Sequence, residues 1–270
     1  MLATERHSFI LDELTQRGVV RIAALAEALD VSVMTIRRDI EMLAEQGLVN
    51  KVHGGATVKT ETITVNEPPF RTKSLRELDS KIAMARNAAT LVTPGASLAL
   101  MGGSTVYALA KRLINVPRLT IVTNSLPISD LFHREGRSDS TVILAGGLRT
   151  PTDSFVGELT VSIFNRLNID IAFMGAHGFD LRGGFSSPNI LESETNRAVR
   201  AHAKKLVVIA DHTKWGEVAF STFAQIKDAD VLITDTGLDD EALQKLSELV
   251  DDVRAVSPTQ LSDTQVRIDA

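Results

Sequence analysis

Thr35, Arg37 and Arg38 bring one hydroxyl and two guanidinium groups together within four residues of the chain. A guanidinium donates two hydrogen bonds at once to a guanine edge or a phosphate, and a hydroxyl bonds to bases or to the backbone. If this segment is a helix, Met34 and both arginines point away from its apolar side. The pattern therefore indicates a helix whose first turns enter the major groove of DNA.

The neighbouring residues predict the helix that would carry these groups. Ser32 is a favoured N-cap residue, and Gly47 is a helix stop. Between them, apolar residues recur at the spacing of one helix face, at Ile36, Ile40 and Leu43. This stripe would pack against the rest of a small domain.

A β-hairpin is predicted directly after this helix. Two short apolar runs, residues 48–52 and 56–58, are separated by His53-Gly54-Gly55. Lys51 and His53 would lie on this hairpin and reach the DNA backbone or the adjacent groove.

Two earlier helical patterns complete the unit. Residues 6–17 have Phe9, Ile10 and Leu14 on one face and end at Gly18, and residues 22–29 have Leu25 and Leu29 inward. Residues 19–22 form an extended segment that could pair with the hairpin. We therefore predict a winged helix-turn-helix. Its expected DNA-binding residues are Ser32, Met34, Thr35, Arg37, Arg38, Lys51 and His53.

Periodicity alone leaves another interpretation open. A capped helix followed by a hairpin occurs in many α+β proteins that never touch DNA. Two adjacent arginines on an exposed face are often only solvated. The residue pattern by itself favours neither interpretation strongly.

A resemblance to a known family favours the first. The stretch closely resembles the DNA-binding signature of the deoxyribonucleoside-repressor (DeoR) family of bacterial regulators. That signature is a Val-Ser turn, then Thr-Ile-Arg-Arg-Asp, a Leu, a Gly and a His-Gly-Gly-Ala wing. It is matched here by Val31-Ser32, Thr35 to Asp39, Leu43, Gly47 and His53 to Ala56. Lys51 stands where the family usually has Arg, which keeps the charge but loses bidentate recognition.

The charge of the chain argues in the opposite direction. The formal net charge is −5, and residues 1–59 hold seven Lys or Arg against eight Asp or Glu. Most DNA-binding domains are net basic. Several of the acidic groups precede the predicted recognition helix (Glu5, Asp12, Glu13, Glu27). We therefore expect a modest affinity of the monomer for DNA, which a homodimer or homotetramer would raise.

Composition limits the remaining classes. The absence of cysteine excludes disulfides, thiolate metal sites and a cysteine nucleophile. Six scattered histidines lack the spacing of metal ligands, so we expect no metal and no other cofactor. Residues 1–7 lack the apolar core of a signal peptide, and no apolar run reaches the roughly 18 residues of a membrane span. These features lead us to expect a cytoplasmic protein without a membrane partner.

A second domain is predicted after a linker. Residues 59–74 are polar and aperiodic and contain Pro68-Pro69, whereas residues 78–92 resume a helical stripe. Seven short apolar strands follow, at residues 97–101, 119–123, 141–145, 169–174, 206–210, 231–234 and 253–256. Such runs, alternating with helical stretches, predict an α/β domain with a mostly parallel sheet covered on both faces. The expected limits are 1–58 for the first domain, 59–74 for the linker, 75–257 for the second domain and 258–270 for a tail.

Five of these strands end in loops rich in glycine and hydroxyl groups. Open α/β sheets bind ligands beyond the carboxyl ends of their strands. Glycines allow close approach of the backbone, helix starts bind anions and a lysine adds positive charge. The loops therefore predict a sugar-phosphate site formed by Gly102, Gly103, Ser104, Thr105, Thr123, Asn124, Ser125, Gly146, Gly147, Gly175, His177, Gly178, Asp211 and Lys214.

Each loop taken alone also has a structural interpretation. Ser104 is a plausible N-cap, Asn124-Ser125 before Pro127 is an ordinary helix start, and His177 is of a type often hydrogen-bonded for structure alone. Five such loops on successive strand ends favour a binding site.

The resemblance to the DeoR family extends over roughly residues 70–235. The sensor domain of the family is similar to ribose-5-phosphate isomerase, glucosamine-6-phosphate deaminase and coenzyme A transferases. Its recurring pieces match Gly103-Ser104-Thr105, Thr123-Asn124-Ser125, Gly146-Gly147, Gly175 to Gly178 and the Asp-x-x-Lys of Asp211 to Lys214. Met101 stands where relatives commonly have Asp, so the effector could differ or bind more weakly.

Two functions remain open from the sequence. The first is a repressor of sugar catabolism genes that binds an operator and is released by a phosphorylated sugar. The second is a sugar-phosphate isomerase or deaminase with an appended helix-turn-helix, for which Asp211, His177 and Asp180 are the convenient acid–base groups. They match no catalytic motif, so we expect a regulator and not an enzyme. Residues 187–197 are either a polar lid over the effector or the exposed start of a helix.

Overall fold

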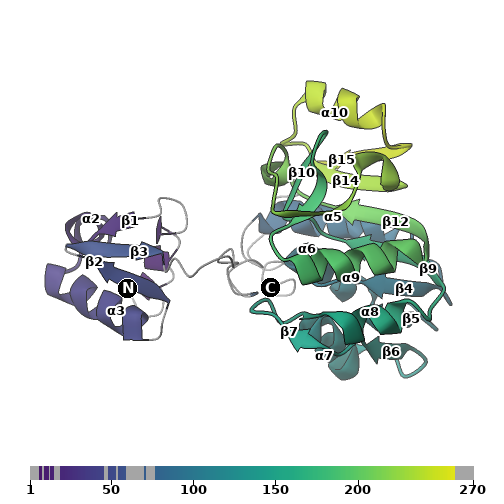
Figure 1. The fold of residues 1–270 in the computed structure, drawn as a ribbon, viewed down its shortest axis with the longest axis horizontal. Helices are drawn as coiled ribbons and strands as arrows, with labels where there is room; N and C mark the ends of the chain where they lie inside the picture. The colour runs from purple at the N-terminus through teal and green to yellow at the C-terminus, as the bar shows by residue number, and fades with distance from the viewer. Residues whose placement is uncertain are drawn as a thin grey trace. The chain divides into compact units, whose positions relative to one another are not determined.

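A computed structural model describes residues 6–7, 9–11, 13–14, 19–45, 48–52, 54–58, 70 and 77–258 of the chain. It divides into two compact units, an N-terminal unit of Met1–Asn66 and a C-terminal unit of Glu67–Ala270 (Figure 1). The predicted linker and tail lie outside the described residues apart from Phe70 and residue 258. The four domain limits given above therefore stay predictions.

The N-terminal unit has the helices and hairpin that the sequence predicts. The described residues between 6 and 14 are helical, and α2 (Ile22–Ala28) and α3 (Val33–Glu45) follow. Strands β1 (Val19–Arg21), β2 (Val49–Val52) and β3 (Gly55–Val58) form an antiparallel sheet in the order β1-β3-β2. The pairing of the extended segment with the hairpin is thus confirmed. Gly18, Gly47 and His53 lie outside the described residues.

The apolar stripe of α3 forms the centre of this unit. Ile36, Ile40 and Leu43 are buried against residues from each of the other elements, namely Ile10, Leu14, Val20, Ile22, Leu25, Ala26, Val49 and Ala56. Because one stripe of α3 makes these contacts, its opposite face is left at the surface.

Gly55 shows why the hairpin needs glycine at its turn. A Cβ at this position would lie 2.0 Å from the carbonyl oxygen of Val20, because β1 passes directly beside β3. Gly54 before it has φ +78°, a conformation that glycine adopts without strain.

The C-terminal unit is built on a seven-stranded sheet. Its strands are β4 (Ser97–Leu100), β5 (Thr120–Thr123), β6 (Thr141–Leu144), β9 (Ile169–Met174), β12 (Ala203–Ile209), β14 (Val231–Asp235) and β15 (Asp252–Val256). All neighbouring strands are parallel, in the order β15-β14-β12-β9-β4-β5-β6. Each strand overlaps one of the seven predicted runs, so the predicted parallel sheet is confirmed.

The two faces of the sheet belong to two separate cores. Alternate residues of a strand point to opposite faces, as Leu98 and Leu100 of β4 lie in one core and Ala99 lies in the other. The first core takes in α5 (Leu78–Ala89), α6 (Ser104–Leu113) and α7 (Leu126–Glu135). The second takes in α8 (Glu158–Phe164), α9 (Ile190–Ala201) and α10 (Asp240–Ser247). Of the described helices named here, three thus pack on each face. Among the described residues, no helix is both long and apolar enough to span a membrane.

Two antiparallel additions lie outside the sequence prediction. β7 (Leu148–Arg149) pairs with β8 (Phe155–Val156). A three-stranded sheet joins β10 (Gly178–Asp180), β11 (Gly184–Ser187) and β13 (Ser221–Ala224). Its aromatic side chains pack ring to ring, with Phe179 and Phe185 centroids 5.9 Å apart and Phe185 and Phe223 centroids 6.2 Å apart. The one or two apolar residues in each of these strands do not form an apolar run of the kind that marked the seven strands of the main sheet.

Candidate DNA-binding and effector-binding sites

The exposed face of α3 presents the predicted cations. Met34, Arg37 and Arg38 are exposed, and neither guanidinium forms a hydrogen bond or ion pair with another described residue. Ser32 caps the helix: its Oγ accepts a hydrogen bond from the Thr35 backbone N at 3.1 Å and lies 2.9 Å from the Thr35 Oγ1. The cap thus sets the direction of the helix start beside these residues.

The hairpin is joined to the same helix by an ion pair. Lys51 Nζ on β2 lies 2.5 Å from Glu41 Oε1 on α3, and both side chains are about half exposed. The hydrogen bond from Lys51 lowers the pKa of Glu41. Such an exposed pair contributes little to stability. The other predicted hairpin contact, His53, lies outside the described residues.

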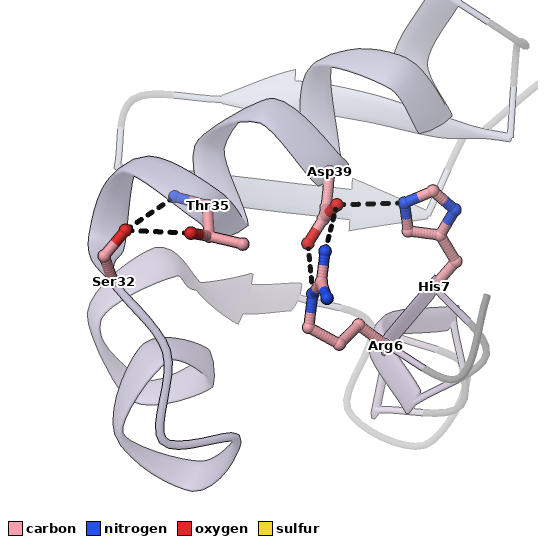
Figure 2. A network of polar contacts seen from close by, with 5 residues as sticks. All are labelled: Arg6, His7, Ser32, Thr35 and Asp39. Carbon is pink, nitrogen blue, oxygen red and sulfur yellow. Dashed lines mark hydrogen bonds and ion pairs between the residues drawn. The ribbon is translucent and has the colours of Figure 1, made fainter. Parts of the chain in front are cut away.

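Asp39 is the residue of this helix whose role was missed from the sequence. It follows Arg38 directly, yet it is buried on the inner side of α3. Its carboxylate accepts hydrogen bonds from Arg6 Nε at 2.8 Å and Arg6 Nη2 at 3.1 Å, and His7 Nε2 lies 3.1 Å away (Figure 2). The contact joins α3 to the first helical segment.

The protonation state of Asp39 follows from these contacts. Burial alone would raise the pKa of its carboxyl group, but the hydrogen bonds from Arg6 and His7 outweigh burial and hold the pKa below its ordinary value. The carboxylate therefore remains charged at neutral pH. The signal that could have indicated this inward contact is an aspartate that directly follows two arginines within the predicted helix.

In the C-terminal unit, the five predicted loops follow five neighbouring strands. These strands are β12, β9, β4, β5 and β6, and they run parallel, so their carboxyl ends share one edge of the sheet. The chain leaves β4 toward β5 and β6 and returns with β9 on the other side of β4. The loops after β4 and β9 thus flank a topological switch point, which is where open α/β sheets bind ligands.

The loop after β4 leads into the start of α6. Gly103, with φ +141°, is the N-cap of α6, and a Cβ there would meet no atom within 4 Å. Ser104 and Thr105 form the first turn of the helix. Gly102 is closely surrounded, because a Cβ on it would lie 2.0 Å from Ser154 Oγ. Backbone N–H groups at such a helix start suit an anion.

The loop after β5 holds the β4 loop in place. Asn124 Oδ1 accepts a hydrogen bond from the Gly102 N at 2.9 Å, and its Nδ2 donates to the Phe155 carbonyl at 2.9 Å. Thr123 Oγ1 donates to the Leu100 carbonyl at 2.5 Å, and Ser125 Oγ caps α7. All three side chains are buried and bonded internally. Their direct contact with an effector stays a prediction.

The loop after β6 is packed in a similar way. The carbonyl of Gly146 accepts a hydrogen bond from Thr160 Oγ1 at 2.9 Å. A Cβ on Gly147 would lie 2.6 Å from the carbonyl oxygen of Val156. Gly147 therefore allows the β7–β8 hairpin and α8 to approach the sheet edge, whereas a Cβ on Gly146 would meet no atom within 4 Å.

The loop after β9 contains one glycine with space around its Cα and one that is closely surrounded. A Cβ on Gly175 would have only the Ile209 carbonyl near it, at 3.9 Å, whereas on Gly178 it would lie 2.2 Å from the Glu217 carbonyl. His177 is half-buried, and its backbone N donates to the Ser186 carbonyl at 3.0 Å. Asp180 was named above as a possible acid–base group. Its Oδ1 accepts hydrogen bonds from the backbone N of Arg182 at 2.8 Å and of Gly183 at 3.0 Å, and these bonds close the β10–β11 turn.

The loop after β12 begins with a capped turn. Asp211 is buried, and its Oδ1 accepts hydrogen bonds from the backbone N of Thr213 at 3.1 Å and from the Thr213 hydroxyl. It caps the short helix η1 (His212–Lys214), which ends at the half-buried Lys214. The intervening His212 bonds to Asp235 of β14, the strand beside β12 in the sheet. Sequence reasoning did not predict this contact.

Residues 187–197 form a helix start. Asn189 caps α9, its Oδ1 accepting hydrogen bonds from the backbone N of Leu191 at 2.9 Å and of Glu192 at 3.3 Å. Ser193 and Thr195 within the segment are buried. Of the two interpretations, the structure therefore supports the helix start and not the lid.

Comparisons with known proteins cover both units. A model described as the DeoR-like helix-turn-helix domain matches residues 6–62, and one described as the DeoR C terminal sensor domain matches residues 76–236.

Whole-chain relatives are transcriptional regulators. The chain is 35% identical to the HTH-type transcriptional regulator GolR of Listeria innocua, over 92% of this chain and 96% of that protein. It is 30% identical to the glycerol-3-phosphate regulon repressor of Escherichia coli, over 92% and 97%. It is 32% identical to the lactose phosphotransferase system repressor of Staphylococcus epidermidis, over 89% and 96%.

Among solved structures, ribose 5-phosphate isomerase A of Methanocaldococcus jannaschii superposes with a TM-score of 0.38. It is 19% identical over 51% of this chain and 54% of that chain.

Proposed function

The chain belongs to the DeoR family of transcriptional regulators, and we propose that it represses genes of sugar catabolism until a phosphorylated sugar binds its C-terminal unit. The observation that carries this proposal is the pair of exposed guanidinium groups, Arg37 and Arg38, on the free face of a capped, tightly packed α3. Relatives named as repressors of glycerol-3-phosphate and lactose regulons support the link to sugar metabolism.

On this proposal α3 is the recognition helix. Thr35, Arg37 and Arg38 contact base edges and phosphates in the major groove, with Ser32 and Met34 at its entry. Lys51 leaves Glu41 to bind a phosphate, and His53 lies beside it on the hairpin. The base contacts would give specificity, and the phosphate contacts would fix the register.

The effector site is proposed at the carboxyl edge of the sheet. The start of α6, with the open Gly103, would hold the phosphate, and Lys214 would add positive charge. Asn124 would act by positioning the Gly102 backbone, which its hydrogen bonds to the Gly102 N and the Phe155 carbonyl support.

Relief of repression requires a ligand that prefers the state with low DNA affinity. A coupling of about 1–3 kcal/mol between the two sites is typical of such regulators. The chain has a net charge of −5, so strong binding by one copy is not expected. We therefore propose a homo-oligomer whose recognition helices contact two half-sites together.

Fluorescence anisotropy of labelled DNA from upstream of the gene tests this proposal. The protein is titrated at a fixed salt concentration of ~100 mM, at which phosphate contacts still register, and then again with pentose, hexose and hexosamine phosphates. We expect saturable binding that one compound relieves. DNA binding that no compound changes would refute the proposed effector response. If the protein binds this DNA no better than non-specific DNA, the proposed operator binding is refuted.

We also propose that the protein does not turn over its effector. Its relatives are regulators, and Asp211, the best-placed base, is already occupied by the N–H and hydroxyl of Thr213. A conversion assay with ribose and hexosamine phosphates checks this. Turnover that Asp211→Asn abolishes would establish the enzyme instead.

A further inference from the structure

His212 and Asp235 form a side-chain pair at the carboxyl edge of the sheet. His212 follows β12 and Asp235 ends β14, the strand beside it. His212 Nδ1 lies 2.8 Å from Asp235 Oδ1. The pair therefore stands on the same edge as the five glycine-rich loops, one strand farther along.

Asp235 is held entirely inside the protein. Its side chain has 0% exposure, and the backbone N of Gly237 donates to its Oδ1 at 2.8 Å. The backbone N of His212 donates to its Oδ2 at 3.4 Å. A carboxylate in such a place is tolerated only because several donors surround it.

The position of the imidazole is fixed as well. A Cβ on Gly237 would lie 2.5 Å from the His212 ring, so this glycine lets the ring lie directly over the backbone turn. An ionised carboxylate only accepts hydrogen bonds, so Nδ1 carries the proton in this contact. The ring orientation and one of its two protonation sites are thereby set.

The other ring nitrogen is left for a ligand. Nε2 lies on the opposite side of the ring from Nδ1, and it has no hydrogen bond to any residue that the structure describes. The side chain is 36% exposed. Lys214 ends the same short helix and adds a cationic group to this loop.

We propose that His212 binds the effector, donating a hydrogen bond from Nε2 to an oxygen of its phosphate, and that Asp235 is the positioning residue that holds the imidazole for this contact. The inference rests on the proposed function and adds β14 to the strands that build the effector site. With Nδ1 bonded to Asp235, Nε2 donates a hydrogen bond when the ring carries both protons, and a ring in that form suits an anion.

His212→Asn separates the two ring nitrogens. An asparagine amide can replace Nδ1 as the donor to Asp235, but it has no group at the position of Nε2. The full-length variant is titrated with the sugar phosphate that relieves DNA binding by the wild type, and relief is expressed relative to each variant's own DNA affinity. We expect the half-relieving concentration to rise about ten- to hundredfold, as for loss of a hydrogen bond to a charged group. His133→Asn, at an exposed histidine of α7, is the matched control and should leave it unchanged.

Ring-nitrogen NMR of the full-length protein supplies a readout that a purely structural role would not move. In the wild type, the Nε2 signal of His212 should shift when the relieving sugar phosphate is added, and the His133 signals should not. Asp235→Asn should shift the Nδ1 signal of His212. As a single substitution it should weaken the relief of DNA binding, but added to His212→Asn it should cause no further weakening. If Asp235→Asn fails to fold, His212→Asn alone decides the point.

The outcomes separate this inference from the proposed function. Wild-type relief that His212→Asn leaves unchanged, with no shift at Nε2, overturns the role of His212 and leaves the regulator intact. If no sugar phosphate relieves DNA binding by the wild type, and neither these compounds nor inorganic phosphate moves a ring signal, both this inference and the proposed effector response are overturned.

Discussion

The Asp39 carboxylate, on the inner face of α3, is bonded to Arg6 at 2.8 and 3.1 Å. It lies one residue from Arg38, which faces the solvent. Two adjacent residues of α3 therefore differ in their surroundings: the Arg38 side chain is exposed, and the buried Asp39 joins the helix to Arg6.

Asp39→Asn removes the charge from this contact and leaves Arg6 without its carboxylate. We expect the unfolding midpoint of the N-terminal unit to fall by roughly 5–10 °C, because the buried side chain at position 39 loses its charge-assisted hydrogen bonds. DNA affinity should fall with it. Differential scanning calorimetry of the full chain and DNA anisotropy measure the two effects.

Glu41→Gln is the matched control for that substitution. Glu41 lies on the same helix, but its pair with Lys51 is exposed, so its loss should leave the midpoint unchanged within error. Equal effects of the two substitutions would show that burial of Asp39 does not matter.

Arg38→Ala should act on DNA binding alone. The side chain is exposed and packs on nothing in the core, so we expect an unchanged unfolding midpoint and a loss of roughly 1–3 kcal/mol in operator binding. Arg134→Ala, at an exposed arginine of the C-terminal unit, controls for the loss of one positive charge. Unchanged operator affinity in Arg38→Ala would mean that another face of the unit meets DNA.

The sequence predicted those parts of the fold that have a regular apolar period. The stripe Ile36, Ile40, Leu43 marked α3, and seven apolar runs marked the parallel sheet, because burial imposes these patterns over many residues. The β10–β11–β13 sheet was not predicted, because its strands contain no apolar run and their packing depends on phenylalanines from separate parts of the chain.

The candidate sites were predictable to a smaller extent. Glycines and cations after strands are visible in the sequence, so the five loops could be assigned to one edge. Polar pairs such as Asp39 with Arg6, or His212 with Asp235, join residues distant in sequence and have no period. Only the tertiary structure shows which partner a buried carboxylate has.

Acid stability should depend on Asp170 in β9. Its carboxylate accepts hydrogen bonds from Lys204 Nζ at 2.8 Å, the Ser97 backbone N at 2.9 Å and the Ser97 Oγ at 2.7 Å. The Lys204 hydrogen bond first, and then those from Ser97, hold the pKa of Asp170 well below its ordinary value. Its contribution to stability is therefore present above the ordinary Asp pKa of about 3.9 and is lost as the pH falls below it.

Asp170→Asn tests this pH dependence. The wild type should unfold at a higher temperature than the variant near neutral pH, and the difference should shrink between about pH 4 and pH 2. The side chain is 41% exposed, so solvent screening keeps the effect moderate. A difference that stays constant over this pH range would show that the charge of Asp170 is not the cause.

Asn124 decides between a positioning role and a ligand role at the effector site. Asn124→Ala leaves the Gly102 N and the Phe155 carbonyl without their partner, and each loss of a buried partner costs about 1–3 kcal/mol. We therefore expect a lower unfolding temperature without any effector, and weaker relief of DNA binding because the start of α6 is no longer held. Asn165→Ala, at an exposed asparagine that ends α8, should change neither quantity. An Asn124→Ala protein of wild-type stability that has lost its response to the effector would instead make Asn124 a direct ligand contact, because a side chain that holds the Gly102 loop cannot be removed without cost to the folded state.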